Sequence, residues 1–161
     1  MSAGSLWPAV KAAYCDAWRT LAGLANVSVL YRDPLLASEV ANDYGGNEAV
    51  WWEGAATGQL EVIELGTPVI ANETLSAAII VQVIGTDTAD TAEVVEARAA
   101  ELLGAVVDHI ANTPRLVVAS GWDDVIVSLQ GTVTWVAVPM QSADRAATRC
   151  RIQVQIEGSR C

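Results

Sequence analysis

The sequence contains no phenylalanine, one histidine and three cysteines among 161 residues. His109 has Asp108 as its neighbour, but adjacent residues of a helix point about 100° apart, so this carboxylate cannot orient the imidazole as a catalytic base. Cys15, Cys150 and Cys161 are widely spaced and include no C-x-x-C pair, which argues against a zinc site or a disulfide framework. We therefore expect three thiols and a structural histidine.

Motifs of enzymes and cofactor sites are also absent. There is no G-x-S-x-G elbow, no G-x-G-x-x-G turn and no Walker loop. The adjacent carboxylates of Asp123 and Asp124 would need further ligands to hold a divalent cation, so we interpret them as a polar turn, with a cation site as the alternative. The prediction is a protein with no enzymatic activity, no catalytic residues, no cofactor and no metal.

Long apolar runs are missing as well. The longest, Leu75–Ile84, is interrupted by Ser76 and Gln82 and is far shorter than the ~20 residues of a membrane-spanning helix. Residues 1–14 lack the basic segment and the continuous apolar segment of a signal peptide. We expect no contact with a membrane and a protein that stays in the cytoplasm where it is made.

Basic residues are scarce in the middle of the chain. Between residues 33 and 112 there are fourteen acidic side chains and one basic one, Arg98, and the whole chain has a formal net charge of −10. A surface of this sign opposes the binding of nucleic acid, because that affinity comes largely from counterions released by Lys and Arg. It is compatible with a channel through which DNA slides without sticking, or simply with a solvated surface.

Two segments have the apolar period of an amphipathic helix. Residues 5–23 repeat apolar side chains every three or four positions, with Ser5 as a candidate cap. The second helix begins at the capping-box spacing of Asp90 and Glu93 and is closed by Pro114.

Alternating or wholly apolar stretches predict the strands. Thr74–Ile84 is apolar on both faces, as expected of a central strand that is covered on both sides. Two short strands, Glu48–Glu53 and Gln59–Leu65, flank a Gly- and Ala-rich turn and predict a hairpin. The other predicted strands are 27–31, 125–129, 133–138 and 150–157, with polar loops at 35–46 and 139–147.

The predicted fold is α+β in a single domain that spans residues 1–161. We expect an antiparallel or mixed β-sheet with two long helices packed on one face, plus an arm made of the 48–65 hairpin and the long 35–46 loop. Two helices are too few to cover both faces of a parallel sheet. The predicted core consists of Val10, Tyr14, Leu21, Ile80, Leu102, Val106, Ile110, Val127, Ile152 and Val154.

The chain has six tryptophans, two of which are neighbours on one predicted strand. Trp51 and Trp52 must point to opposite faces of that strand and cannot share one core. We expect at least one of them in a subunit interface, where Trp is enriched, with burial under the 35–46 loop as the alternative. Leu60 and Trp135 complete the predicted interface set.

Six stretches of the sequence together carry a family resemblance. They are Trp7-Pro8-Ala9-Val10, Val27-Ser28-Val29 followed by Asp33-Pro34, Val81-Gln82-Val83-Ile84-Gly85, the Ala-rich helix 94–103, Asn112-Thr113-Pro114-Arg115-Leu116, and the alternating strand Cys150–Glu157. Spanning most of residues 5–157, the chain resembles the tail terminator proteins of long, non-contractile-tailed phages that infect actinobacteria, a group related in fold to the lambda-type terminator. It departs from them at Tyr31–Leu35, where members have a Gly-rich turn.

The resemblance implies a structural virion protein that forms a hexameric ring, caps the finished tail tube and joins it to the head connector. The implied partners are other copies of this chain, the tail tube protein and the head completion or connector protein, with DNA only as the passing genome. The implied location is the head–tail junction of the virion, after assembly in the host cytoplasm. If DNA passes through such a ring, the acids expected along the lumen are Glu61, Glu64, Glu73, Glu93, Glu96 and Glu101.

Two other functions stay open at the level of sequence. A head completion protein, acting as connector or stopper, or a tail tube subunit would be a neighbouring part of the virion, and a tube subunit is expected to contain more strand and less helix. A small α+β enzyme or ligand-binding protein is the alternative from a different class. The lack of a convergent nucleophile, base and acid argues against it.

Overall fold

The computed structural model of the protein describes residues 5–32, 48–66, 70–85, 91–118, 121–138 and 146–160. Along the chain the elements are α1 (Trp7–Arg19), a 3-10 turn η1 (Ala22–Leu24), β1 (Ser28–Leu30), β2 (Glu48–Trp52), β3 (Thr57–Glu64), β4 (Ile70–Ile84), α3 (Ala92–Asn112), β5 (Arg115–Leu116), β6 (Asp123–Ala137) and β7 (Ala147–Arg160). The predicted 35–46 loop, most of the predicted 139–147 loop, and Cys161 lie outside the described residues.

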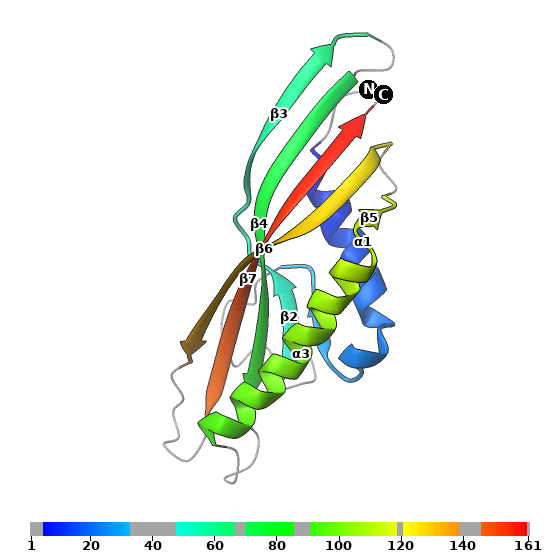
Figure 1. Ribbon diagram of the computed structural model, residues 1–161. Helices are drawn as coiled ribbons and strands as arrows, with labels where there is room; N and C mark the ends of the chain where they lie inside the picture. The colour runs from blue at the N-terminus through cyan, green and yellow to red at the C-terminus, as the bar shows by residue number, and fades with distance from the viewer. Residues whose placement is uncertain are drawn as a thin grey trace.

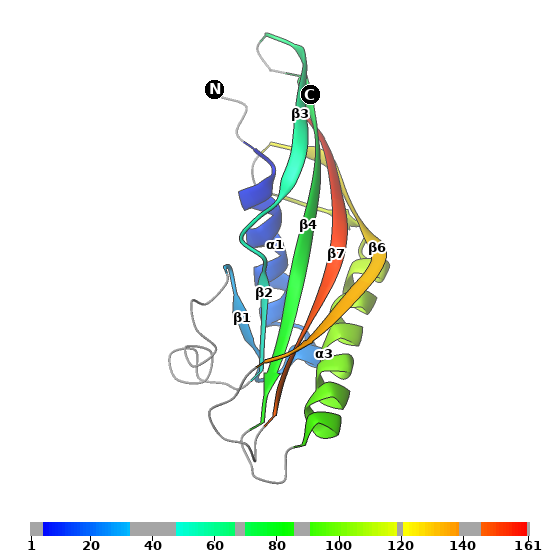
Figure 2. The same ribbon diagram turned by 90° about the vertical axis from the view of Figure 1, so that its left-hand side faces the viewer.

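The strands form one seven-stranded mixed sheet that curls along its length (Figure 1 and Figure 2). Its order is β1-β2-β4-β7-β6-β5, and β3 also pairs with β4. β1 and β2 run parallel, and every other neighbouring pair runs antiparallel. The centre is β4 against β7, paired without a register shift from Ala71↔Arg160 to Ile84↔Ala147. The α+β class and the mixed sheet are thus confirmed.

The strands β2 and β3 do not form the hairpin that the sequence predicts. Both pair with the same edge of β4: β2 lies beside Ile79–Val83, and β3 lies beside Ile70–Ser76. They follow one another in the same direction, because the 15 residues of β4 are long enough to hold both. The hairpin joins β3 to β4 instead. A Cβ at Gly58 would lie 2.0 Å from the Thr74 carbonyl oxygen, so this close ladder requires glycine there.

The last third of the chain contains one long bent strand where the sequence predicts two. β6 runs continuously from Asp123 to Ala137, and its register against β7 shifts between Leu129 and Val133. Gly131 lies at this irregularity with a φ of 74°, a backbone conformation that other residues rarely adopt. The predicted break at Gly131 is therefore a bulge inside β6.

Helix α3 confirms the second predicted helix and ends two residues before Pro114. Its N-cap is Thr91, whose side chain makes no capping hydrogen bond, and Asp90 lies outside the described residues. Helix α1 is shorter than the predicted 5–23, because Thr20 is already its C-cap and the 3-10 turn η1 follows. Within the described chain, neither helix has a stretch long and apolar enough to cross a membrane.

One large apolar core joins side chains of α1 and α3 to alternate positions of the strands. Leu21 packs against this core, partly buried. Ile80 is the exception among the predicted core residues, since it belongs to a small separate cluster with Trp51, Ile84 and others. The predicted core residues that the large core does contain are Val10, Tyr14, Leu102, Val106, Ile110, Val127, Ile152 and Val154.

The two apolar clusters define two sides of the sheet. We call the side that bears the large core the core face, and the opposite side the outer face. Side chains alternate along a strand, so Ile79 and Val81 of β4 lie on the core face, and Ile80 and Gln82 lie on the outer face. Residues directly opposite one another in an antiparallel pair share a face, which assigns the exposed strand positions as well.

Candidate functional site

His109, near the end of α3, is hydrogen-bonded to α1. Trp18 Nε1 donates to His109 Nδ1 at 3.2 Å, so Nδ1 is unprotonated and the neutral ring carries its proton on Nε2. Burial lowers the pKa of His109, and the Tyr14 ring meets the imidazole edge-on at 5.9 Å between ring centres. The imidazole thus ties the two helices together, which is a structural role.

Asp123 and Asp124 begin β6 at an irregular part of the strand. Asp124 has a φ of 47° and forms an ion pair with Arg115, with 3.1 Å between Oδ1 and Nη1. It shares a hollow of about 360 Å³ with Glu73 and Glu157. Among the described residues, no group of three or more His, Cys, Asp or Glu side chains is placed to hold a metal ion. The side-chain partner of Asp124 in this structure is the Arg115 guanidinium.

Cys15 and Cys150 are buried free thiols. Cys15 Sγ donates a hydrogen bond to the Leu30 carbonyl oxygen at 3.7 Å, and burial raises the pKa of this thiol. Burial also raises the pKa of Cys150 to about 11. Because the thiolate is the nucleophilic form of cysteine, both side chains are unreactive near neutral pH.

Trp51 and Trp52 lie on opposite faces of β2, as their alternation predicts, and both are 0% exposed. Trp52 is at the centre of an aromatic group on the core face, where it stacks on Trp18 at 5.7 Å and meets Trp7 edge-on at 5.3 Å. Trp51 lies on the outer face, with the Arg149 guanidinium 5.2 Å from its ring centre. As expected, the two rings do not share one core, but the domain buries both of them, Trp52 in the large core and Trp51 in the small cluster on the outer face. An interface role for either ring stays a prediction.

Two arginines of β7 place positive charge on the outer face of this acidic protein. Arg149 donates from Nε and Nη2 to Gln82 Oε1, at 3.0 and 2.7 Å. Arg151 donates from Nε to Glu53 Oε2 at 2.5 Å. Gln82 of β4 therefore holds the Arg149 guanidinium in place, and Glu53, which follows β2, holds that of Arg151.

Glu73 is buried, with 5% of its surface exposed. Its carboxylate accepts hydrogen bonds from Ser5 Oγ at 2.7 Å and from the Leu6 backbone N–H at 2.5 Å. The first N–H groups of a helix lack partners and the helix dipole is positive there, so a carboxylate is stabilised at this position. The structure places Glu73 inside the fold, where it anchors the start of α1 to β4, and removes it from the exposed acidic set.

Glu93, Glu96 and Glu101 are exposed on α3. Arg98 donates to both carboxylate oxygens of Glu48, from Nε at 2.6 Å and from Nη2 at 3.2 Å, and Arg98 Nη1 donates to Glu101 at 2.9 Å. These hydrogen bonds, first to Glu48 and then to Glu101, raise the pKa of Arg98. The basic residue of the acidic middle thus holds α3 to β2 and offsets part of the charge of Glu101.

Glu61 and Glu64 are exposed on β3 and point away from the core face. They lie opposite Asn72 and Ile70 of β4, positions that alternate with the core-face residue Ala71. Helix α3 packs against the core face, so its acids lie on the other side of the sheet. The predicted lumen acids are therefore not brought together: in a given orientation of the subunit, a lumen can be lined by the α3 acids or by the β3 acids.

Strand β3 is an exposed edge of the sheet. All its residues are exposed, and no described strand pairs with its second edge. Leu60, 46% exposed, lies opposite Glu73, and Val62 lies opposite Ala71, so both side chains are on the core face. Free backbone N–H and C=O groups beside exposed apolar side chains are a template for pairing with another chain.

The end of β6 is a second exposed edge. β5 covers β6 only at residues 125–126, and no described strand pairs with the far edge of Val133–Ala137. Trp135 lies on the core face, opposite a buried position of β7, yet it is 45% exposed. It lines a hollow of about 400 Å³ together with Glu96 and Ala100 of α3. Leu60 and Trp135, two of the predicted interface residues, thus lie on two different open edges.

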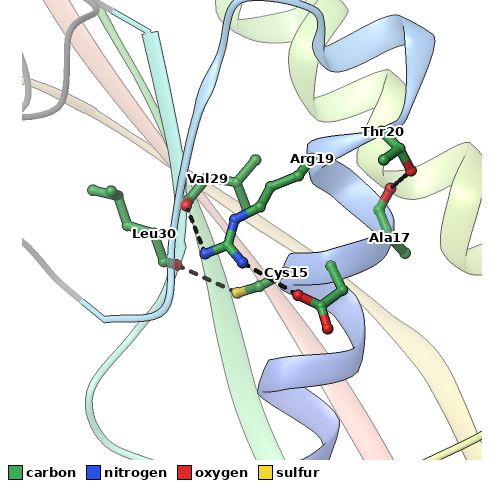
Figure 3. A network of polar contacts seen from close by, with 7 residues as sticks. Cys15, Ala17, Arg19, Thr20, Val29 and Leu30 are labelled. Atoms are coloured by element: carbon green, nitrogen blue, oxygen red, sulfur yellow. Dashed lines mark hydrogen bonds and ion pairs between the residues drawn. The ribbon is translucent and has the colours of Figure 1, made fainter.

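The short strand β1 lies at an edge of the sheet, and side chains of α1 donate hydrogen bonds to its backbone carbonyl groups (Figure 3). Arg19 Nη2 donates to the Val29 carbonyl oxygen at 3.4 Å, and Cys15 Sγ donates to the Leu30 carbonyl oxygen. Arg19 is held in place by Asp16, with 3.2 Å between Nη1 and Oδ1. Adjacent carbonyl groups point to opposite edges of a strand, so one of these two contacts occupies a backbone acceptor on the free edge of β1.

No protein-family model and no curated protein matches this sequence. Similarity therefore assigns no family, and the residues and their geometry carry the functional inference.

Proposed function

We propose that this protein is a structural subunit of a phage virion, a tail terminator whose copies form a ring that caps the tail tube and joins it to the head connector. The sequence resemblance suggests this role. The observation that supports it is the pair of open sheet edges, β3 on one side and Val133–Ala137 of β6 on the other, both with exposed apolar side chains. Different edges at opposite sides of one sheet permit head-to-tail association, which yields a ring when the rotation closes.

In the proposed ring, both helices pack on one face of the sheet, as the sequence predicts. Support comes from the large core, to which α1 and α3 both contribute buried side chains. The outer face is then free to line a lumen or to meet a neighbouring virion protein.

The state of the chemically reactive side chains also supports a structural role. The imidazole of His109 accepts a hydrogen bond from Trp18, and the thiols of Cys15 and Cys150 are buried. The carboxylate of Glu73 is bound to the start of α1. These groups stabilise the fold and do not converge on a substrate-sized site.

Images of the purified protein test the proposal most directly. We expect negative-stain microscopy to show closed rings with a central hole, and light scattering to give the mass of about six chains. Compact monomers at every protein concentration tested would contradict a ring-forming role. Rings that stop the growth of tail tubes when both are mixed would distinguish a terminator from other ring proteins.

The acids allow a test of which face lines the lumen. One variant carries Glu93→Lys and Glu96→Lys on α3, and its matched variant carries Glu61→Lys and Glu64→Lys on β3. An acidic lumen keeps DNA moving because no counterion release rewards contact. We expect rings of one variant to retain DNA at low salt and release it at high salt, while rings of the other do not. If neither retains DNA, these acids do not line the lumen.

A tail tube subunit is the second candidate, because strands dominate this chain. β4, β6 and β7 have 15, 15 and 14 residues, whereas the helices α1 and α3 have 13 and 21. A tube subunit would stack its rings into long tubes under the same imaging conditions. Single rings that bind the head connector and leave tail tubes unchanged would point instead to a head completion protein.

A further inference from the structure

We propose that the two open edges bind each other between copies of this chain: the segment Gly58–Val62 of β3 pairs with Val133–Ala137 of β6 in the next copy and continues the sheet. Both segments are five residues long. On β3 the regular ladder ends at the shift between Val62 and Glu64, and on β6 the bulge that contains Gly131 ends the free segment at Val133. This inference rests on the proposed ring function and names its contact surface.

The side chains of the core face favour one register. Strand β3 runs antiparallel to β4, and β6 runs in the same direction as β4, because each antiparallels β7. A neighbour in the same orientation therefore presents β3 antiparallel to β6. The antiparallel register that sets Leu60 opposite Trp135 also sets Val62 opposite Val133 and Gly58 opposite Ala137. Aromatic and β-branched cross-strand pairs of this kind stabilise a sheet.

The outer face of the same register is complementary in charge. Glu61 would lie opposite Thr134, whose neighbour across β6 and β7 is Arg151. Val136 has Arg149 as its neighbour in the same way. Glu61 would lie two strands from Arg151, which is about 10 Å at about 4.8 Å per strand, so the exposed acid of β3 is attracted across β6 by the positive charge of β7. A partner edge lined with acids would lack this attraction, which favours a second copy of the chain as the occupant.

The position of the two edges along the sheet fixes the shape of the assembly. Measured along β4, Leu60 lies level with Glu73, and Trp135 lies level with Val81 through Cys150. Each copy is therefore displaced along the strands by about 26 Å relative to the previous copy, at about 3.3 Å per residue. Such a stagger closes into a ring when the strands tilt against the ring axis, as in closed barrels. Without the tilt, the same contact would build a helical filament.

Disulfide trapping tests the register. The test variant carries Leu60→Cys and Trp135→Cys, in a background with Cys150→Ala and Cys161→Ser that removes the thiol directly opposite Trp135 on β7 and the terminal thiol, and that keeps the buried Cys15. Directly opposite residues in an antiparallel pair lie close enough for a disulfide. Mild oxidation should give a ladder of covalent oligomers on a denaturing gel. The matched control, Glu61→Cys with Trp135→Cys, places its thiols on opposite faces and should give roughly tenfold less of these oligomers.

A second variant keeps the inference testable without cysteines. Val62→Lys introduces a charge on the exposed strand, so the chain should fold normally. The protein concentration at which half of the chains are assembled should rise by roughly tenfold, because the lysine would have to be buried against Val133 of the neighbour. Val117→Lys, the same change at a residue that is 93% exposed and outside both segments, is the matched control and should leave assembly unchanged.

The outcomes separate this inference from the proposed function. Rings that form without selective Leu60–Trp135 cross-linking overturn the edge pairing and leave the ring proposal standing. Selective cross-linking in helical filaments, with no rings, supports the pairing and contradicts the terminator. Equal cross-linking in test and control variants, or an unchanged assembly of Val62→Lys, overturns the pairing.

Discussion

The strands β1 and β3 both lie at the edge of the same sheet, but they differ in length and in how far other groups cover them. β1 has three residues, and carbonyl oxygens of Val29 and Leu30 are bound by Arg19 and Cys15 of α1. β3 has eight residues, all exposed, and its apolar side chains include Leu60 and Val62. Proteins protect edge strands by keeping them short or covering them. Among the residues that the structure describes, β1 has both protections and β3 has neither, which is why we propose β3 as the edge that pairs with another chain.

The largest expected effect is a loss of stability in the core, which a substitution on the open edge of β3 should not cause. Leu102→Ala should lower the free energy of unfolding by about 2–5 kcal/mol, because Leu102 is fully buried in the large core and its loss leaves a cavity. Leu60→Ala should change it by less than about 0.5 kcal/mol, since the side chain is half exposed in the free chain. Urea unfolding at low protein concentration measures both. A loss of equal size at Leu60 would show that β3 belongs to the folding core.

A smaller change in stability is expected when Glu73 of β4 is replaced, compared with Glu61 of β3. Glu73→Gln should cost about 1–2 kcal/mol, because the variant loses a charge that accepts two hydrogen bonds at the start of α1. Glu61→Gln, at an exposed position of β3, is the control and should be nearly neutral. Thermal unfolding of the two variants compares them. If Glu73→Gln is also neutral, the carboxylate does not anchor α1.

Acid should lower the stability of the folded chain through His109, which joins α3 to α1. The pKa of His109 is lowered in the folded chain by burial, so the unfolded chain binds more protons just below the ordinary value of 6.5. Its contribution to stability is present above pH 6.5 and is lost as the pH falls through the lowered pKa. Protonated Nδ1 also cannot accept the hydrogen bond from Trp18. We expect His109→Gln to flatten the pH profile of stability just below pH 6.5; an unchanged slope would contradict the assignment.

The smallest expected effect concerns the contacts that close β1. Arg19→Ala should cost less than about 1 kcal/mol, because the Arg19–Asp16 pair is exposed and such pairs contribute little. Asp16→Ala is the control that keeps the hydrogen bond from Arg19 to Val29. Particle size, measured by light scattering, should match the parent protein in both variants. Larger or irregular particles from Arg19→Ala alone would show that the uncovered β1 edge also pairs, and that its closure prevents aggregation.

Local patterns were enough to predict the helices and the centre of the sheet. The stripe of Leu102, Val106 and Ile110 turns toward the large core, as its spacing predicts, because one period governs a whole helix. The alternation of Ile152 and Val154 assigns one face of β7 in the same way. These features depend on neighbours within a few residues, which the sequence displays directly.

Features that depend on distant pairing could not be predicted from the sequence. The partner of β3 is β4, and the preceding turn at residues 54–58 gives no sign that β2 and β3 share one long strand. The burial of Glu73 depends on Ser5 and Leu6, which are more than sixty residues away in sequence. Val62 and Val133, which belong to the proposed edge pairing, were not among the predicted interface residues, because their exposure follows only from where the ladders end. The sequence itself displays only that apolar residues recur at alternate positions of both stretches, Leu60 with Val62 and Val133 with Trp135.

The unbroken ladder between β4 and β7 has a mechanical consequence. Its register runs without a shift from Ala71↔Arg160 to Ile84↔Ala147, and β3 lies at one end of it while the free segment of β6 lies toward the other. A pull along the strands that enters at one edge and leaves at the other loads the hydrogen bonds of this ladder in shear, so they share the force. A pull across the strands would open them one at a time. The folded chain therefore resists tension along its strands far better than peeling at either edge.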